Sequence, residues 1–201
     1  EEAKTFMEKI HAIATTIRVS DGDMEKGHLR CDANVSLRPE GQKEFGTRTE
    51  TKNLNSFRFV QNAIDYEIER QREEILDGVT IVQETRLWDT DRKVTFSMRS
   101  KEEADEYRYF PDPDLPLVKL SPELIETLRK NLPELPDAKK QRFMEEYGLN
   151  EYDAGVLTAS QELSEYFEKV LAGGAVPKIA CNWITGDLTR VMNESGTTLI
   201  E

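Results

Sequence analysis

Cysteine and histidine are scarce in this chain, and their scarcity excludes several classes of site. The two cysteines among 201 residues, Cys31 and Cys181, lie far apart and form no Cys-x-x-Cys pair. Neither a disulfide framework nor a structural zinc site is therefore expected, and a reducing cytoplasm is the expected compartment. His11 and His28 are the two histidines and stand in no recognisable pairing with Ser or Cys. The sequence therefore indicates neither a nucleophilic triad nor a transition-metal centre.

Long apolar runs, a basic excess and glycine-rich phosphate loops are also missing. No run approaches the roughly 20 apolar residues of a membrane-spanning helix, so no membrane partner is expected. With 39 acidic and 27 basic residues, the net charge of −12 argues against non-specific nucleic-acid binding. A nucleic acid held by a local patch or by another subunit is still compatible with this charge. The absence of Gly-x-x-x-x-Gly-Lys-Ser/Thr and Gly-x-Gly-x-x-Gly excludes P-loop and Rossmann nucleotide sites.

Hydrophobic periodicity divides the chain into two regions. Helical spacing over 1–17 and 56–76 is combined with strand-like patterns over 28–38, 46–54, 80–89 and 93–100. From Ser121 onward the helical patterns are 122–131, 137–147, 151–158, 160–172 and 177–194, separated by Pro and Gly. We therefore predict an α+β fold class, with an antiparallel sheet in a domain over 1–120 and an all-α domain over 121–201.

The first predicted strand has one apolar face and one wholly polar face. If its hairpin with the next strand centres on Gly41, Asp32 lies opposite Glu50 and Arg30 lies opposite Lys52. Two facing carboxylates are hard oxygen ligands of the kind that Mg²⁺ binds, and flanking basic side chains suit phosphate oxygens. The alternative is a solvated sheet face with weak ion pairs. The long loop leaves the register open.

Further polar side chains extend this pattern to the later strands. Gln83, Glu84 and Arg86 lie within the third predicted strand, and Arg99 and Arg108 flank the segment after the fourth. A single arginine is more often a surface residue, but several strands that carry Asp, Glu and Arg would together build a metal–phosphate cradle.

The stretch YRYFPDPDLP, residues 107–116, follows these strands. Its prolines at positions 111, 113 and 116 exclude a helix and a regular central strand. We expect them to fix an extended path out of the sheet. Asp112 or Asp114 could cap a turn or face a metal cavity, and turn capping is favoured because Asp beside Pro is a common turn residue.

Two features of the helical region have alternative interpretations. Lys139, Lys140 and Arg142 form a basic cluster, which is either a solvated helix face or a contact for a tRNA backbone. The helical stripe that includes Trp183 and Val191 is more typical of a core than of a ligand site.

Five strings resemble one family across nearly the whole chain. They are LRCDANVSLRP (29–39), TETKNLNSF (49–57), VQETRLWD (82–89), MRSKEEADEYRYFPDPDLP (98–116) and LPELPDAKKQRFMEEYGL (132–149). Together they resemble the B subunit of the aspartyl/glutamyl-tRNA(Asn/Gln) amidotransferases, the GatB family.

This resemblance implies a fold and an activity. The family's fold is a cradle-shaped catalytic domain related to glutamine synthetase, followed by a helical domain and a small tail domain. The implied activity uses ATP and Mg²⁺ to phosphorylate the side-chain carboxylate of Glu-tRNA(Gln) or Asp-tRNA(Asn). Ammonia that the family's amidase partner releases from glutamine then displaces phosphate, and a clasp partner holds the two larger subunits together.

The resemblance also implies site residues. By the family's pattern, Asp32 and Glu50 fall at metal-ligand positions, which agrees with the Gly41-centred register. On chemical grounds we expect catalytic roles for Arg30, Lys52, Glu84 and Arg86. We expect nucleotide or phosphate binding by Asn53, Asn55, Gln83, Arg99 and Arg108.

Two family features are missing from the chain: a Gly-Leu-Glu-x-His-type motif with further metal ligands, and the tail domain. We therefore expect a fragment with part of the cradle and most of the helical domain, inactive alone. The alternative to an enzyme subunit is a non-catalytic acidic scaffold that docks partner subunits or tRNA.

Overall fold

A computed structural model describes residues 1–100, 111–197 and 199, with only the backbone of residues 99 and 100. Contacts between residues divide the chain into two compact units. The first comprises Glu1–His11 and Val19–Ser121, and the second comprises Ala12–Arg18 and Pro122–Glu201. Helix α1 (Glu2–Thr16) contributes to both. Among the described residues, no helix is long and apolar enough to span a membrane.

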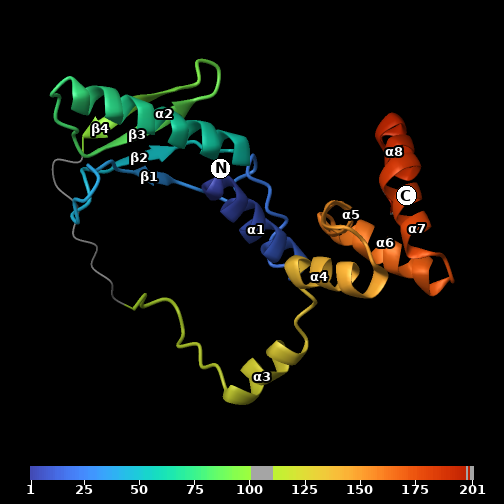
Figure 1. Ribbon diagram of the computed structural model, residues 1–201. Coiled ribbons are helices and arrows are strands. Elements are labelled where there is room, and N and C mark those ends of the chain that lie inside the picture. Colours follow the sequence, from blue (N-terminus) through green and yellow to red (C-terminus); the bar gives the residue numbers. More distant parts are fainter. Residues whose placement is uncertain (101–110, 198, 200–201) are drawn as a thin grey trace. The chain divides into compact units, whose positions relative to one another are not determined.

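The first unit contains a four-stranded sheet in the order β1-β2-β3-β4 (Figure 1). Strand β1 (Ala33–Val35) pairs antiparallel with β2 (Thr49–Lys52), and β3 (Glu84–Asp89) pairs antiparallel with β4 (Val94–Ser100). The α+β class is confirmed, but β2 and β3 are parallel, so the sheet is mixed and not wholly antiparallel. The cause is the helix between them, because a helical crossover returns the chain in its original direction.

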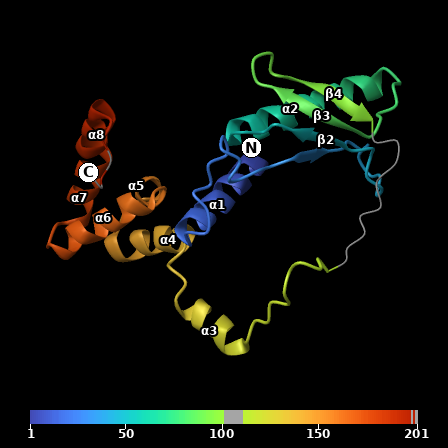
Figure 2. The same ribbon diagram turned by 180° about the vertical axis from the view of Figure 1, so that it is seen from behind.

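Helix α2 (Phe57–Leu76) makes this crossover and lies along one face of the sheet, as Figures 1 and 2 show from opposite sides. It starts as predicted at Ser56, whose Oγ accepts a hydrogen bond from the Phe59 amide at 3.1 Å. Its buried Val60 and Ala63 pack in a cluster with Trp88 of β3. The apolar stripe of α2 therefore explains why one face of the sheet is covered.

A buried charge network joins α2 to the same face of the sheet. The Glu67 carboxylate has no exposed surface and accepts hydrogen bonds from Thr49 of β2 and Thr95 of β4. Arg70 donates to it at 2.8 Å, and the Arg86 Nε lies 3.1 Å from it. Two guanidinium groups thus offset the cost of burying one carboxylate.

The second unit is helical. Its helices after α1 are α3 (Pro122–Lys130), α4 (Pro136–Tyr147), α5 (Glu151–Thr158), α6 (Gln161–Ala172), α7 (Pro177–Trp183) and α8 (Thr189–Ser195), with a π-helical turn at Ile184–Leu188. Phe143, Leu157, Phe167 and Ile184 belong to its buried core. This core joins α4, α5, α6 and the π-helical turn.

The predicted core stripe at the end of the chain is partly wrong. Ile184 is buried, but Trp183 is 63% exposed and Val191 is 49% exposed. A π-helical turn changes the angular spacing of side chains. A stripe counted at 3.6 residues per turn therefore does not stay on one face.

The Pro-rich stretch is described from Pro111 onward; Arg108 lies outside the described residues. The Asp112 Oδ1 accepts a hydrogen bond from the Asp114 amide at 2.8 Å, and the Leu115 amide donates to the Asp112 carbonyl at 3.3 Å. The prediction that an aspartate here caps a turn is confirmed for Asp112.

Replacing Glu67 tests the charge network. We expect Glu67→Gln to lower the free energy of unfolding by about 3 kcal/mol, because it removes the buried charge that Arg70 and Arg86 share. Each arginine then keeps only its pair with a more exposed carboxylate, that of Glu74 or Glu84. Chemical denaturation measures this loss. The matched control is Glu69→Gln on the same helix, which breaks an exposed pair with Arg72 and should cost less than about 0.5 kcal/mol. Equal losses in the two variants would contradict the assignment.

The same network predicts a pH dependence. Burial raises the pKa of Glu67, but hydrogen bonds from Arg70, Thr95 and Thr49 outweigh burial and leave the pKa below its ordinary value of 4.5. A carboxyl whose pKa is lower in the folded state stabilises the fold above pH 4.5 and loses that contribution as the pH falls through the folded-state pKa. The stability difference between wild type and Glu67→Gln should therefore shrink in denaturation curves below pH 4.5.

Candidate functional site

The face of the sheet opposite α2 carries the candidate site. Along β2, Thr49 and Thr51 are buried towards the helix, while Glu50 and Lys52 point to the other face and keep partial exposure. On β1, Ala33 and Val35 are buried, and Asn34 between them is exposed. The two strands therefore present a polar face to solvent.

The register of the hairpin differs from the predicted one. Asn34 pairs with Glu50 and Ala33 pairs with Thr51, which corrects the prediction that Asp32 lies opposite Glu50. The register is shifted by two residues, so every side chain keeps its predicted face. A long loop between strands sets no unique register, whereas the alternation of apolar and polar residues fixes the face.

Lys52 joins the two predicted metal ligands. Its Nζ lies 2.6 Å from the Asp32 Oδ2 and 3.5 Å from the Glu50 Oε1. The Thr85 Oγ1 of β3 donates to the other Glu50 oxygen at 3.0 Å. The structure thus brings Asp32, Glu50 and Lys52 together and holds the Glu50 carboxylate from two sides.

The charges in this cluster affect one another. The hydrogen bond to Asp32 raises the pKa of Lys52 above its ordinary value, despite some burial, and the nearby Glu50 adds to this effect. Lys52 is therefore a cation at neutral pH. It balances part of the negative charge of the carboxylate pair.

A pocket of about 330 Å³ adjoins Asp32. It brings together four predicted residues: Arg30, Asp32, Asn53 and Asn55. The Arg30 Nε donates to the Gly27 carbonyl at 3.2 Å, in the loop that forms one wall. The volume lies within the range of small-molecule sites, and the wall combines cationic, amide and carboxylate groups.

Asn53 shapes this pocket through its backbone. It follows β2 directly and has a positive φ of 67°, a left-handed conformation that Asn adopts more readily than most residues. Its Nδ2 donates to the Trp88 carbonyl at 3.0 Å, and its Oδ1 accepts from Asn55 at 3.3 Å. Asn53 thus ties the end of β2 to β3 and turns the chain towards α2.

The structure does not bring Glu84 and Arg86 to this face. Arg86 pairs with Glu84 and Glu67, and it donates to the Thr95 Oγ1 at 2.7 Å, on the side covered by α2. Their catalytic roles stay a prediction, but their contacts are those of the buried network. The sequence shows that Glu84 and Arg86 share one face of the strand, but it does not show which face α2 covers. The face that bears Thr85 is the one that contacts Glu50.

The other predicted residues are placed only in part. Gln83 precedes β3 and is half-buried. Arg99 pairs through its backbone with Thr85, and its side chain lies outside the described part of the chain. The position of Arg108 is likewise not described. Thr85 and the loop from Met24 to Gly27 were not predicted, although strand alternation relative to Glu50 indicates Thr85.

The cluster offers two carboxylate groups for a divalent cation. Mg²⁺ is typically held in proteins by one or two carboxylates, with water and substrate phosphates completing its shell. Asp32 and Glu50 fit this partial role. Within the described residues there is no group of three or more His, Cys, Asp and Glu side chains placed to hold a metal. These two carboxylates would therefore share the cation with other ligands.

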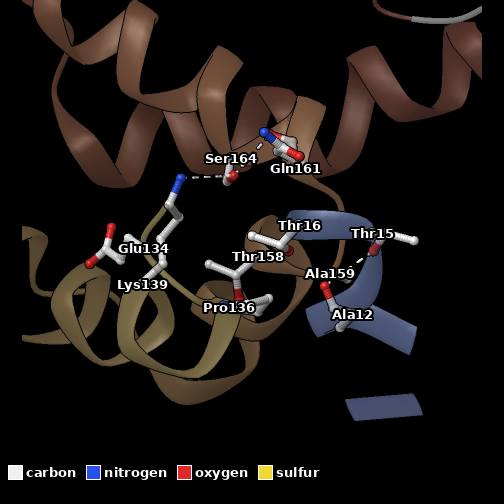
Figure 3. A pocket seen from close by; sticks show the side chains of 10 residues that line it. All are labelled: Ala12, Thr15, Thr16, Glu134, Pro136, Lys139, Thr158, Ala159, Gln161 and Ser164. Atoms are coloured by element: carbon white, nitrogen blue, oxygen red, sulfur yellow. Dashed lines mark hydrogen bonds between the residues drawn. The ribbon is translucent and has the colours of Figure 1, made fainter. Parts of the chain in front are cut away.

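The second unit has a cavity of a different kind (Figure 3). Its volume of about 30 Å³ has room for roughly one water molecule. Lys139 and Ser164 meet at its wall, with 3.4 Å between Nζ and Oγ, and Lys139 also pairs with Glu168 at 3.2 Å. This cavity is too small for a nucleotide, so it does not compete with the pocket beside Asp32.

The basic cluster of α4 is engaged in ion pairs. Besides the Lys139 pair, Lys140 lies 3.0 Å from Glu151, and Arg142 lies 2.6 Å from Glu134. These partners favour the interpretation of this surface as a helix face with ion pairs. A contact with tRNA is untested.

Comparison with known proteins identifies the family. A family model described as the GatB/GatE catalytic domain matches residues 1–126. The chain belongs to this family. The aspartyl/glutamyl-tRNA(Asn/Gln) amidotransferase B subunits of Alkalilimnicola ehrlichii and Carboxydothermus hydrogenoformans are each 55% identical to it over 201 residues, and that of Geobacter sulfurreducens is 54% identical. The resemblance stated from the five sequence strings is confirmed.

The chain spans only part of these relatives. The matches cover 100% of this chain but 42% of each of the three relatives. The sheet unit and the helical unit therefore correspond to a portion of these longer proteins.

The backbone of Asn53 provides a test of the pocket's architecture. We expect Asn53→Ala to lower the free energy of unfolding by about 2 kcal/mol, since it combines left-handed strain with loss of the bond to Trp88. Asn53→Gly removes the bond without the strain and should cost about half as much. Urea denaturation compares the two, and a larger loss for glycine than for alanine would refute the conformational argument.

Proposed function

We propose that this chain is the part of an amidotransferase B subunit that binds Mg²⁺ and ATP phosphates on the face of its sheet opposite α2. We call this the open face. The observation that carries the proposal is the cluster of Asp32, Glu50 and Lys52 beside a pocket that Arg30 lines. Two carboxylates, two cations and a cavity of ligand size are what a metal–phosphate site needs. The family relationship and the names of the relatives support the assignment to an amidotransferase B subunit.

The proposed reaction has two steps. A side-chain carboxylate oxygen of Glu-tRNA(Gln) or Asp-tRNA(Asn) attacks the γ-phosphorus of ATP, the bond to ADP breaks, and an acyl phosphate forms. Ammonia then attacks the acyl carbon, the carbon–oxygen bond to phosphate breaks, and the amide and phosphate are released. The ammonia comes from glutamine through an amidase partner, and a clasp partner holds the complex together in the cytoplasm.

The residues of the open face divide this work by their chemistry. Asp32 and Glu50 would hold the cation, which lowers the charge repulsion on the transferring phosphoryl group. Lys52 and Arg30 would pair with phosphate oxygens, since both are cationic and partly exposed. Asn53 and Asn55 would offer amide hydrogen bonds at the pocket wall.

The decisive variants are Asp32→Ala and Glu50→Ala in the full-length protein, assembled with its amidase and clasp partners. We expect each to reduce ADP release stimulated by Glu-tRNA(Gln) or Asp-tRNA(Asn) by about 100-fold or more, because the cation loses a ligand where charge develops. Steady-state ADP release for each tRNA measures the loss and also reports which substrate is used.

The control for this experiment is Asp65→Ala. Asp65 is exposed on α2, the helix on the opposite face of the sheet, so its removal should leave ADP release unchanged. A scaffold without catalysis predicts no specific loss of ADP release for Asp32→Ala or Glu50→Ala. In that case Asp32→Ala would retain the wild-type rate, or would impair assembly with the partner subunits alone.

A further inference from the structure

The Lys52 ammonium group occupies the position between Asp32 and Glu50 that a bridging metal cation would take. Its ammonium group lies 2.6 Å from one carboxylate and 3.5 Å from the other, and it comes from the same strand as Glu50. One positive charge is therefore shared by two negative ones. Nothing else in the described part of the cluster brings a second cationic group to Asp32 at ion-pair distance.

A divalent cation and this ammonium group compete for the same oxygens. Mg²⁺ binds oxygen at about 2.0–2.1 Å and needs near-ideal octahedral geometry, which a lysine already bonded to the Asp32 Oδ2 obstructs. Two cations on one carboxylate oxygen also repel each other. Full use of the carboxylate pair by a metal therefore requires Lys52 to move.

Lys52 is able to move because its constraints are few. Its side chain is 38% exposed, that of Asp32 is 44% exposed, and a lysine ammonium sits on a flexible four-carbon stem. Glu50 is more firmly held, since its side chain is 19% exposed and Thr85 bonds its second oxygen. The carboxylate that stays in place is thus that of Glu50, and the part that moves is the lysine.

We propose that Lys52 is a placeholder cation that occupies the Asp32–Glu50 pair in the nucleotide-free protein and transfers to nucleotide phosphates when the metal binds. This inference rests on the proposed metal–phosphate site and adds a positioning role for Lys52 within it. It makes metal and nucleotide binding interdependent, because phosphates provide the lysine with a new partner as the metal takes its old one. Such coupling is reciprocal and typically amounts to about 5- to 150-fold in affinity.

The prediction for Lys52→Met has opposite signs for the two ligands. Methionine keeps the approximate length of the side chain but has no charge, so it leaves the carboxylate pair without its internal cation. In the nucleotide-free, full-length protein within its complex, we expect Mn²⁺ to bind about tenfold more tightly than to wild type. A non-hydrolysable ATP analogue, in the presence of saturating Mn²⁺, should bind about tenfold more weakly because a phosphate has lost its cation.

Two binding measurements test these effects without any catalytic reaction. Electron paramagnetic resonance of free Mn²⁺ gives the metal affinity, and equilibrium binding of the analogue gives the nucleotide affinity. Lys52→Arg keeps the charge and should stay near wild type in both. The matched control Lys178→Met breaks an ion pair with Asp153 in the second unit and should change neither.

The outcomes separate this inference from the proposed function. If Lys52→Met leaves Mn²⁺ affinity unchanged, or weakens both ligands together as a structural defect would, the placeholder role is overturned while the site stands. Asp32→Asn tests the site itself. If it leaves Mn²⁺ affinity unchanged in wild type and in Lys52→Met, the carboxylate pair is not the metal site, and both proposals fail.

Discussion

The buried carboxylate of Glu67 determines which face of the sheet is available for chemistry. It bonds to Thr49 on β2 and Thr95 on β4 while two arginines neutralise it, so α2 is attached to strands of both hairpins. Removing one partner from a buried ion pair costs far more stability than forming the pair contributes. Positions of α2 that separate Glu67 from its partners are therefore strongly disfavoured. The opposite face of the same sheet is left to carry Asp32, Glu50 and Lys52.

The two faces of β2 therefore have different roles, although their residues alternate along one strand. Thr49 and Thr51 face the helix, and Glu50 and Lys52 face solvent, because side chains alternate along a strand. The parallel pairing of β2 with β3 then places Thr85 beside Glu50 and Arg86 beside Thr51. One strand-to-strand register thus assigns Thr85 to the open face and Arg86 to the buried network.

Sequence patterns predicted the elements and the faces better than the pairings. The helix after Ser56 and the polar face of β1 and β2 follow from local periodicity and capping, which the sequence records directly. The register of the β1–β2 hairpin, the parallel step to β3 and the π-helical turn near Ile184 depend on contacts between distant residues. Periodicity contains no information on these contacts. Arg86 shows the consequence, since its strand was predicted correctly but its partners lie under α2.

Family membership and geometry agree on the same small region of the first unit. The family's catalytic domain matches residues 1–126, which include the whole sheet and its crossover helix. Within it, the pocket beside Asp32 is lined by charged and amide side chains, whereas the larger pocket of the second unit, about 490 Å³, is lined mainly by apolar side chains such as Ile179 and Trp183. This contrast favours the α+β part of the chain for the proposed chemistry.

The most direct test of this account is the crystal structure of the full-length protein with Mn²⁺ and a non-hydrolysable ATP analogue. Anomalous scattering locates Mn²⁺ independently of the refined atoms. The account predicts an anomalous peak within coordination distance of both the Asp32 and Glu50 carboxylates, with the Lys52 ammonium on a phosphate oxygen. A peak at other ligands, with Lys52 still bridging Asp32 and Glu50, would contradict it.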